Sequence, residues 1–270
     1  MAEVRDTLRV TAGDRKALGR HSPSSTPGCS EKRDAIEAAI PALNEELSEL
    51  QTRLWAEGRR SLLVVLQALD AGGKDGTIRH AFQGLNPQGT RVTAFKAPTP
   101  EELAHDFLWR VHQATPAAGE VGIFNRSHYE DVLVVRVHQL VPTKVWRARY
   151  GLIKGFEEAL HEGGTTIVKL FLHISKEEQR RRFEERLTRP DKRWKFNRGD
   201  LEERAHWDDY QEAYAEALAR TSTEAAPWYV VPADHKWYRN WAVTSILVET
   251  LRELDPRYPE VEGIDAIEIP

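Results

Sequence analysis

From Ser61 onward, short continuous apolar runs alternate with longer segments whose apolar residues recur every three or four positions. Continuous runs are typical of strands buried on both faces, and the longer spacing is typical of helices packed on one side. The predicted strands are Ser61–Leu69, Arg91–Lys96, Val121–Phe124, Thr165–Ile174 and Trp228–Val231. The predicted helices are Thr77–Gln83, Pro100–Gln113, Tyr129–Leu140, Gly151–Glu162, Lys176–Leu187, Glu203–Arg220 and Trp237–Leu254.

Strands separated by helices need crossover connections, so the pattern predicts an α/β fold with a five-stranded parallel sheet between two helical layers. Ligands of such sheets bind at the carboxyl ends of the strands. Before the first strand, an apolar stripe predicts an amphipathic helix, whose main part would start at Pro41. The stripe consists of Ile36, Ile40, Leu43, Leu47, Leu50 and Leu54. It could be a seam between subunits, but it is too short to favour that over packing within one domain.

Composition limits the class of protein. Of the 270 residues, 40% are hydrophobic and 30% are charged, which is typical of a soluble globular protein. No apolar stretch is long enough to cross a membrane and none resembles a signal peptide, so we expect a cytoplasmic protein. The single cysteine excludes an internal disulfide, and the net charge of −4 argues against stable nucleic-acid binding. Residues 1–30 become rich in Ser, Pro and Gly, which predicts a flexible arm before one catalytic domain over 31–270.

The segment between the first predicted strand and the next helix has the composition of a phosphate-binding loop. Gly72 and Gly73 let the backbone approach an anion closely, and Lys74 adds a mobile positive charge. Backbone N–H groups of such a turn and of the following helix point at the anion. We expect phosphate contacts from Gly72, Gly73, Lys74, Asp75, Gly76 and Thr77.

Two positions depart from the usual phosphate-loop pattern, which has Gly six residues before the Lys and Ser or Thr directly after it. Ala68 and Asp75 occupy these places. We interpret Asp75 and Asp70 as magnesium ligands, direct or through water, that replace the missing hydroxyl. Taken alone, the loop fits equally well an ordinary strand-to-helix turn whose glycines only relieve strain.

A second group of polar residues follows the third predicted strand. Asn125 and Arg126 end this strand, and Glu130 and Asp131 lie on the next turn. A phosphate-loop enzyme normally has a metal-binding carboxylate at the place of Asn125. Glu130 and Asp131 are therefore candidates for the missing charge, with Asp131 as a third magnesium ligand. Arg126 suits bidentate phosphate binding.

A basic segment follows the fourth predicted strand. Gln179–Arg198 contains nine Lys or Arg against three Asp or Glu, and Arg182 and Arg186 share one helix face. Such a segment can form a lid that neutralises phosphate charge and excludes water. It can also be a solvated charged face, or bind RNA, because Trp194 and Phe196 lie between the cations. The nearby phosphate loop makes the lid the preferred interpretation.

Together these segments resemble the polyphosphate kinase 2 family over about residues 32–258, nearly the whole chain. The NRSHYED form of the second motif resembles class III, the subgroup that accepts both nucleoside mono- and diphosphates. Many members of other subgroups carry Asp where this chain has Asn125. The stretches that carry the resemblance are Leu69–Ile78 (LDAGGKDGTI), Leu85–Gly89 (LNPQG), Phe95–Thr99 (FKAPT), Phe124–Asp131 (FNRSHYED) and the lid-like run Arg182–Arg198.

The resemblance implies a three-layer α/β/α P-loop kinase fold like that of thymidylate kinase, with a helical lid at about residues 179–200. It implies polyphosphate as phosphoryl donor, AMP and ADP as acceptors, Mg²⁺ as cofactor, and assembly as a homodimer or homotetramer. The family's loop and second-motif residues map to Asp70, Gly73, Lys74, Asp75, Asn125, Arg126, Glu130 and Asp131. Its lid residues map to Arg182, Arg186, Lys192 and Arg198.

We therefore expect in-line transfer of the terminal phosphoryl group of polyphosphate to AMP or ADP, forming ADP or ATP. Asp70 would orient magnesium, and Lys74 and Arg126 would hold the transferring phosphate. Arg182 and Arg186 would close over the donor chain. Two alternatives stay open at this point: an ATP-dependent nucleoside monophosphate kinase on the same fold, and a non-catalytic module that binds nucleotide or RNA.

Overall fold

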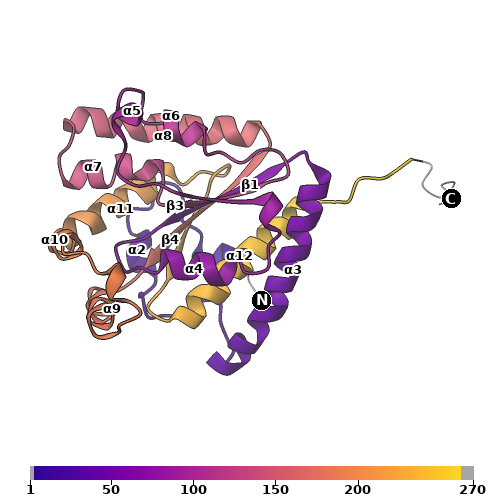
Figure 1. The fold of residues 1–270 in the computed structure, drawn as a ribbon, viewed down its shortest axis with the longest axis horizontal. Coiled ribbons are helices and arrows are strands. Elements are labelled where there is room, and N and C mark those ends of the chain that lie inside the picture. The colour runs from indigo at the N-terminus through magenta and orange to yellow at the C-terminus, as the bar shows by residue number, and fades with distance from the viewer. Residues whose placement is uncertain (1–2, 263–270) are drawn as a thin grey trace.

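The computed structural model describes residues 3–262, so residues 1–2 of the predicted arm and 263–270 of the predicted domain lie outside it. At its centre is a sheet of parallel strands in the order β2-β3-β1-β4-β5 (Figure 1). The α/β class and all five predicted strands are confirmed. The strands are β1 (Ser61–Gln67), β2 (Thr90–Ala94), β3 (Val121–Asn125), β4 (Thr165–His173) and β5 (Trp228–Pro232).

Helices cover the sheet on both faces. On one face α3 (Arg33–Glu57), α4 (Lys74–Ala81) and α12 (Lys236–Leu254) pack together, and on the other α8 (Thr143–Glu162) packs on β4 and α11 (Trp207–Thr221) packs on α8. This is the arrangement that right-handed crossovers between parallel strands produce. The shorter elements are α1 (Val4–Leu8), α2 (Ala17–Arg20), η1 (Pro87–Gly89), α5 (Pro100–Leu103), α6 (Trp109–His112), η2 (His128–Asp131), α7 (Val134–Val137), α9 (Lys176–Thr188), η3 (Arg193–Lys195) and α10 (Gly199–Ala205).

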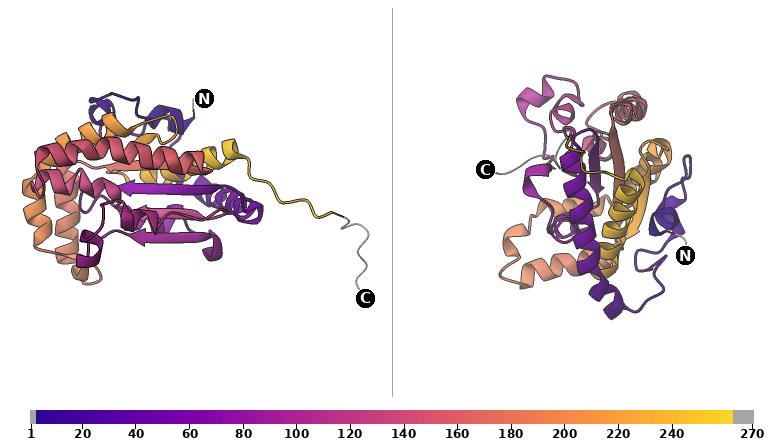
Figure 2. Two further views of the ribbon diagram at one scale, coloured as in Figure 1. Left: turned by 90° about the horizontal axis from the view of Figure 1, so that it is seen from above. Right: turned by 90° about the vertical axis from the view of Figure 1, so that its right-hand side faces the viewer.

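The N-terminal segment differs from the predicted flexible arm, because it packs along the domain beside α12 (Figure 2). Leu8 and Val10 are buried. The backbone N–H of Val10 donates to the carbonyl of Trp228 at 2.8 Å, and Arg9 forms an antiparallel bridge with Tyr229. These contacts cover the outer edge of β5, which would otherwise present unpaired backbone groups. Its apolar residues recur at no regular spacing, so the sequence pattern did not predict that this segment packs on the domain.

The predicted amphipathic helix is confirmed as α3, but it runs through Pro41 and does not start there. Pro41 is exposed, so solvent can satisfy the carbonyl group that loses its helical partner. The apolar stripe packs on α12 of the same chain, with Leu47 and Leu54 fully enclosed. The stripe is thus explained within one chain, and the predicted dimer or tetramer stays a prediction.

Other helix predictions also have wrong boundaries, and the predicted Glu203–Arg220 runs across the break between α10 and α11. The segment after β2 forms α5 and α6 separately, and the segment after β3 forms η2 and α7. α8 starts at Thr143, well before the predicted start at Gly151, because this glycine and Gly155 are tolerated inside the helix. No helix in residues 3–262 combines the length and apolar character needed to cross a membrane. A cytoplasmic location stays a prediction.

Candidate active site

One cleft of about 640 Å³ lies at the carboxyl ends of the strands, between the loop after β1, the lid helix α9 and the start of α12. Ten Lys or Arg and four Asp or Glu line it, although the whole chain carries a net charge of −4. Lys74 of the loop and Arg186 of the lid both line this cleft. Positive charge is therefore concentrated where an α/β sheet binds its ligand.

The loop between β1 and α4 needs both of its central glycines. A Cβ atom on Gly72 would lie 2.5 Å from Cβ of Ala68, and Gly73 has a φ of +104°. The Nζ atom of Lys74 donates to the carbonyl of Ala68 at 2.7 Å, so the lysine folds back across the loop. Burial and the nearby charge of Arg126 lower the pKa of Lys74 to about 8.

Polar side chains from β3 hold the two acidic residues of the loop. Nη2 of Arg126 donates to Oδ1 of Asp70 at 2.8 Å, and Nδ2 of Asn125 donates to Oδ1 of Asp75 at 3.0 Å. Nζ of Lys195, in the lid, lies 3.5 Å from Oδ2 of Asp75. Asn125 therefore orients a carboxylate, which explains how an amide can occupy a place that often holds an acid.

Two of the predicted residues contact the site residues from outside the cleft lining. Thr77 is buried, and its hydroxyl donates to the carbonyl of Gly73 at 3.1 Å, so its predicted phosphate contact stays a prediction. Oε2 of Glu130 lies 3.7 Å from Nη1 of Arg126. Burial alone would lower the pKa of Arg126, but the attraction of Glu130 and Asp70 outweighs it and raises the pKa. Arg126 is thus firmly cationic.

Asp131 lies apart from the other two predicted magnesium ligands. Its Oδ1 accepts a hydrogen bond from Nη1 of Arg149 at 2.8 Å, and burial raises the pKa of Asp131 to about 6. Within the described part of the chain, no three His, Cys, Asp or Glu side chains gather closely enough to hold a metal ion. The carboxylate of Asp131 is thus bound to an arginine, and its assignment as a third magnesium ligand stays a prediction.

Arg182 fixes the backbone of the phosphate loop. Its side chain is 6% exposed, and its Nη1 donates to the carbonyls of Ala71 at 2.9 Å and Gly72 at 3.1 Å. Nε2 of Gln179, on the same helix, donates to the carbonyl of Asp70 at 2.8 Å. Arg182 also lines the cleft, but its N–H groups are bound to backbone oxygens, so its predicted contact with the donor chain stays a prediction.

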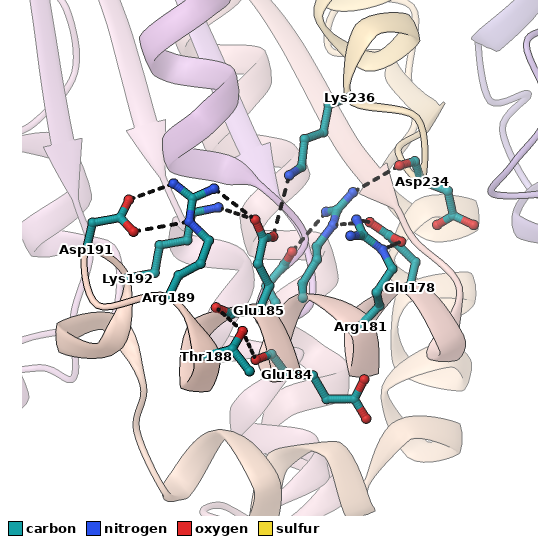
Figure 3. A network of polar contacts seen from close by, with 12 residues as sticks. Glu178, Arg181, Glu184, Glu185, Thr188, Arg189, Asp191, Lys192, Asp234 and Lys236 are labelled. Carbon is teal, nitrogen blue, oxygen red and sulfur yellow. Dashed lines mark hydrogen bonds and ion pairs between the residues drawn. The ribbon is translucent and has the colours of Figure 1, made fainter.

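Cations of the lid and of α12 converge on Glu185, which lines the cleft (Figure 3). Its carboxylate lies 2.6 Å from Nζ of Lys192, 3.2 Å from Nη1 of Arg189 and 3.9 Å from Nζ of Lys236. Lys192 and Lys236 also line the cleft, so an anion that enters it competes with Glu185 for these two side chains.

The two remaining lid residues differ in position. Arg186 lines the cleft, and its Nη1 donates to Oδ2 of Asp200 at 2.8 Å. Arg198 is exposed at the start of α10 and lies outside the cleft lining, so this structure does not bring it to the site.

Sequence reasoning missed Lys236 and Arg239, both of which line the cleft from the first turns of α12. Arg239 is 2% exposed, and its guanidinium donates to Oδ1 of Asn240 at 2.7 Å. Among residues 3–262, no Asp or Glu forms an ion pair with it. Burial and the charge of Arg182 lower the pKa of Arg239 to about 10. The sequence feature that could have identified Lys236 and Arg239 is their position. Both are cations in the first turns of a helix, where the helix dipole disfavours positive charge.

The guanidinium of Arg239 also touches the phosphate loop. A Cβ atom on Gly73 would lie 2.2 Å from its Nη1, and one on Gly76 would lie 3.3 Å from its Nη2. A buried cation without an acidic partner has an uncompensated charge, which is energetically costly. An anion bound to the glycine loop beside it would compensate this charge.

Comparison with known proteins identifies the family of this chain. The family model for polyphosphate kinase 2 (PPK2) matches residues 30–259. The chain belongs to the polyphosphate kinase 2 family. Over 254 residues it is 58% identical to the AMP/ADP-polyphosphate phosphotransferase of Meiothermus ruber, which covers 94% of this chain and 95% of that protein. It is 45% identical to the ADP-polyphosphate phosphotransferase of Rhodopseudomonas palustris, with 94% and 91% covered.

A solved structure of the family has the same fold. The crystal structure of polyphosphate kinase 2 from Arthrobacter aurescens TC1 superposes with a TM-score of 0.92 at 47% identity, covering 97% of this chain and 92% of that one. The predicted family and the predicted P-loop kinase fold are thereby confirmed, and the chain is a kinase.

Proposed function

We propose that this polyphosphate kinase 2 transfers the terminal phosphoryl group of inorganic polyphosphate to AMP and ADP, forming ADP and ATP. The excess of cations in the cleft is the observation that carries the proposal. Ten Lys or Arg line it, whereas Phe95 and Trp194 are its only aromatic residues in the described chain. A long polyanion fits such a surface better than a donor nucleotide, whose base favours an apolar pocket. The 58% identical relative is named as an AMP/ADP-polyphosphate phosphotransferase, which supports AMP and ADP as acceptors.

The proposed catalysis is electrostatic, because phosphoryl transfer needs positioning and charge neutralisation more than covalent chemistry. Lys74 and Arg126 hold the transferring phosphate, and the N–H group of Gly73 adds a donor. The N–H group of Gly72 is already bound to the carbonyl of Leu69 at 2.9 Å. Arg186 then contacts the donor chain from the lid. The attacking oxygen belongs to a phosphate that is already ionised at neutral pH, so the reaction needs no strong general base.

The remaining assignments follow from the placement of the side chains. Arg182 fixes the loop, and Lys192, Lys236 and Arg239 contact the donor chain on the α12 side of the loop. Lys96 lines the cleft on the opposite side, after β2, where we place the phosphate of the acceptor nucleotide.

A divalent cation fits the acidic side chains of the loop. Asp70 and Asp75 both line the cleft. One oxygen of Asp70 is bound to Arg126, and Asp75 has one oxygen bound to Asn125 and the other 3.5 Å from Nζ of Lys195. Magnesium in kinases is held by one or two carboxylates together with substrate phosphates. We therefore assign Mg²⁺ to Asp70 and Asp75, directly or through water, where it would supply further neutralisation of phosphate charge.

The test supplies AMP with polyphosphate or with ATP as sole donor, with and without Mg²⁺, and separates the nucleotides by chromatography. We expect ADP and ATP from polyphosphate and Mg²⁺, and little product without the metal. Product from ATP alone would favour a nucleoside monophosphate kinase. Salt-dependent RNA binding with no phosphoryl transfer would favour a binding module. Light scattering of the same preparation measures the predicted dimer or tetramer.

A further inference from the structure

A buried polar cluster lies outside the cleft, under α8. Nζ of Lys169, on β4, donates to Oε2 of Glu157 at 2.6 Å, to the hydroxyl of Tyr129 at 2.9 Å and to the carbonyl of Thr221 at 2.7 Å. The Tyr129 hydroxyl donates to Oε1 of Glu157 at 2.8 Å, and Nε2 of His128 lies 3.2 Å from the same oxygen. Lys169, Tyr129 and His128 have no exposed surface, and Glu157 is 1% exposed.

The cluster has the bonding of an ion pair. An ammonium group has three N–H donors, and the three acceptors around Nζ of Lys169 match them. Burial alone would raise the pKa of Glu157, but Lys169 and His128 outweigh it and lower the pKa. None of the four side chains lines the cleft. Apolar side chains could fill this space without the cost of removing two charges from water. We therefore expect the ion pair to hold a backbone conformation in place.

The segment directly after β3 has such a backbone conformation. Arg126 has a φ of +62°, a conformation that residues other than glycine rarely adopt. The next residue, Ser127, is buried, and its hydroxyl accepts hydrogen bonds from Nε2 of Gln67 at 3.1 Å and from the N–H of Tyr129 at 3.2 Å. The two residues after Ser127 both bind the carboxylate of Glu157. A strained backbone persists only when its surroundings over-determine it. The cluster binds the side chains of both residues that follow Ser127.

We propose that Lys169 and Glu157 are positioning residues that act through Tyr129 and His128 to hold Arg126 in its strained conformation. The guanidinium of Arg126 then reaches Asp70 at 2.8 Å and faces the cleft. The inference rests on the proposed function of Arg126 as a phosphate contact. It explains why a tyrosine and a histidine, which touch no substrate site, directly follow the Arg126–Ser127 pair.

Tyr129→Phe is the least disruptive test, because it removes one hydroxyl and keeps the ring packed on Trp228. We expect kcat with polyphosphate and AMP to fall about tenfold, because small misplacements of a positioned group reduce turnover strongly. The KM for AMP should stay unchanged. In an Arg126→Ala background, the same Tyr129→Phe change should alter kcat by less than about twofold, because residues that act as a unit are non-additive.

The matched control is Thr165→Val, at the opposite end of the sheet. The hydroxyl of Ser61 donates to that of Thr165 at 2.9 Å in a buried bond between the starts of β1 and β4. Thr165→Val should lower Tm and leave kcat within about twofold of the wild type, which separates a loss of stability from a loss of positioning.

Two kinetic outcomes would overturn the inference: a folded Tyr129→Phe variant with wild-type kcat, or an equal fall in kcat with and without Arg126. A crystal structure of the variant gives a readout that needs no turnover. We expect the φ of Arg126 to leave the positive region, and an unchanged Arg126 conformation would also contradict the inference. An active wild type with additive effects would refute only this inference, whereas a wild type that is inactive with polyphosphate would refute the proposed function.

Discussion

Replacement of Arg239 by Met should make the protein more stable and a poorer binder of polyphosphate. Burial and Arg182 lower the pKa of Arg239 from 12.5 to about 10, and this lowering corresponds to about 3 kcal/mol against the charged form. Loss of the hydrogen bonds to Asn240 should cost about 1 kcal/mol. The free energy of unfolding should therefore rise by about 2 kcal/mol, or roughly 4–8 °C in Tm.

The assay is thermal unfolding with and without polyphosphate, combined with steady-state kinetics. Polyphosphate should raise the Tm of the wild type, because it binds the native state, and should raise that of Arg239→Met much less. The KM for polyphosphate should rise about tenfold, since a charge-assisted contact is lost, while the KM for AMP stays the same. Lys236→Met removes an exposed cation of the same cleft, so its Tm without ligand should not change.

A lower Tm for Arg239→Met, together with an unchanged KM for polyphosphate, would refute this reasoning. Arg239 would then be a structural cation whose charge the surrounding protein already balances.

The remaining predictions concern the charge balance and shape of the loop. Glu185→Gln should lower the KM for polyphosphate, because it frees the cations that this carboxylate holds; an unchanged or higher KM in steady-state kinetics would contradict it. In the protein without ligand, Lys74 has a pKa of about 8, and bound phosphate should keep this lysine protonated. Above that pH, binding of polyphosphate takes up a proton, so the KM for polyphosphate should rise with pH. Lys74→Arg should remove this rise between about pH 7 and 9.5, as measured by steady-state kinetics. Gly73→Ala should abolish turnover and lower Tm in a thermal melt, because its φ is +104° and its Cβ would lie 2.2 Å from a guanidinium nitrogen; a variant with normal turnover would show that the loop can relax.

The parts of the fold that are encoded locally could be predicted from the sequence. β1 is buried along its whole length, so its apolar run was visible, and Gly72, Gly73 and Lys74 follow it directly. The N-terminal segment was missed because its contacts are with β5 and α12, more than two hundred residues away. Local pattern carries no information about such partners.

The same limit explains the outcome for the site residues. Asp131 is close to Arg126 in sequence, but the turn of η2 directs it to Arg149 on α8. Arg182 matched a lid motif, yet its side chain binds carbonyls of the loop. Arg239 lies on α12, the last helix within residues 3–262, and reaches the loop only through the tertiary fold. Residue type and spacing identified candidates, whereas the direction of each side chain depended on packing between distant elements.

The most direct measurement is the initial rate of ADP formation from AMP, polyphosphate and Mg²⁺ at saturating substrate, for the wild type and Lys74→Ala. The account predicts a fall of about a hundredfold or more, as expected for loss of one preorganised donor to the transferring phosphate, with an unchanged circular dichroism spectrum. A Lys74→Ala enzyme that keeps a near wild-type rate with polyphosphate would contradict it.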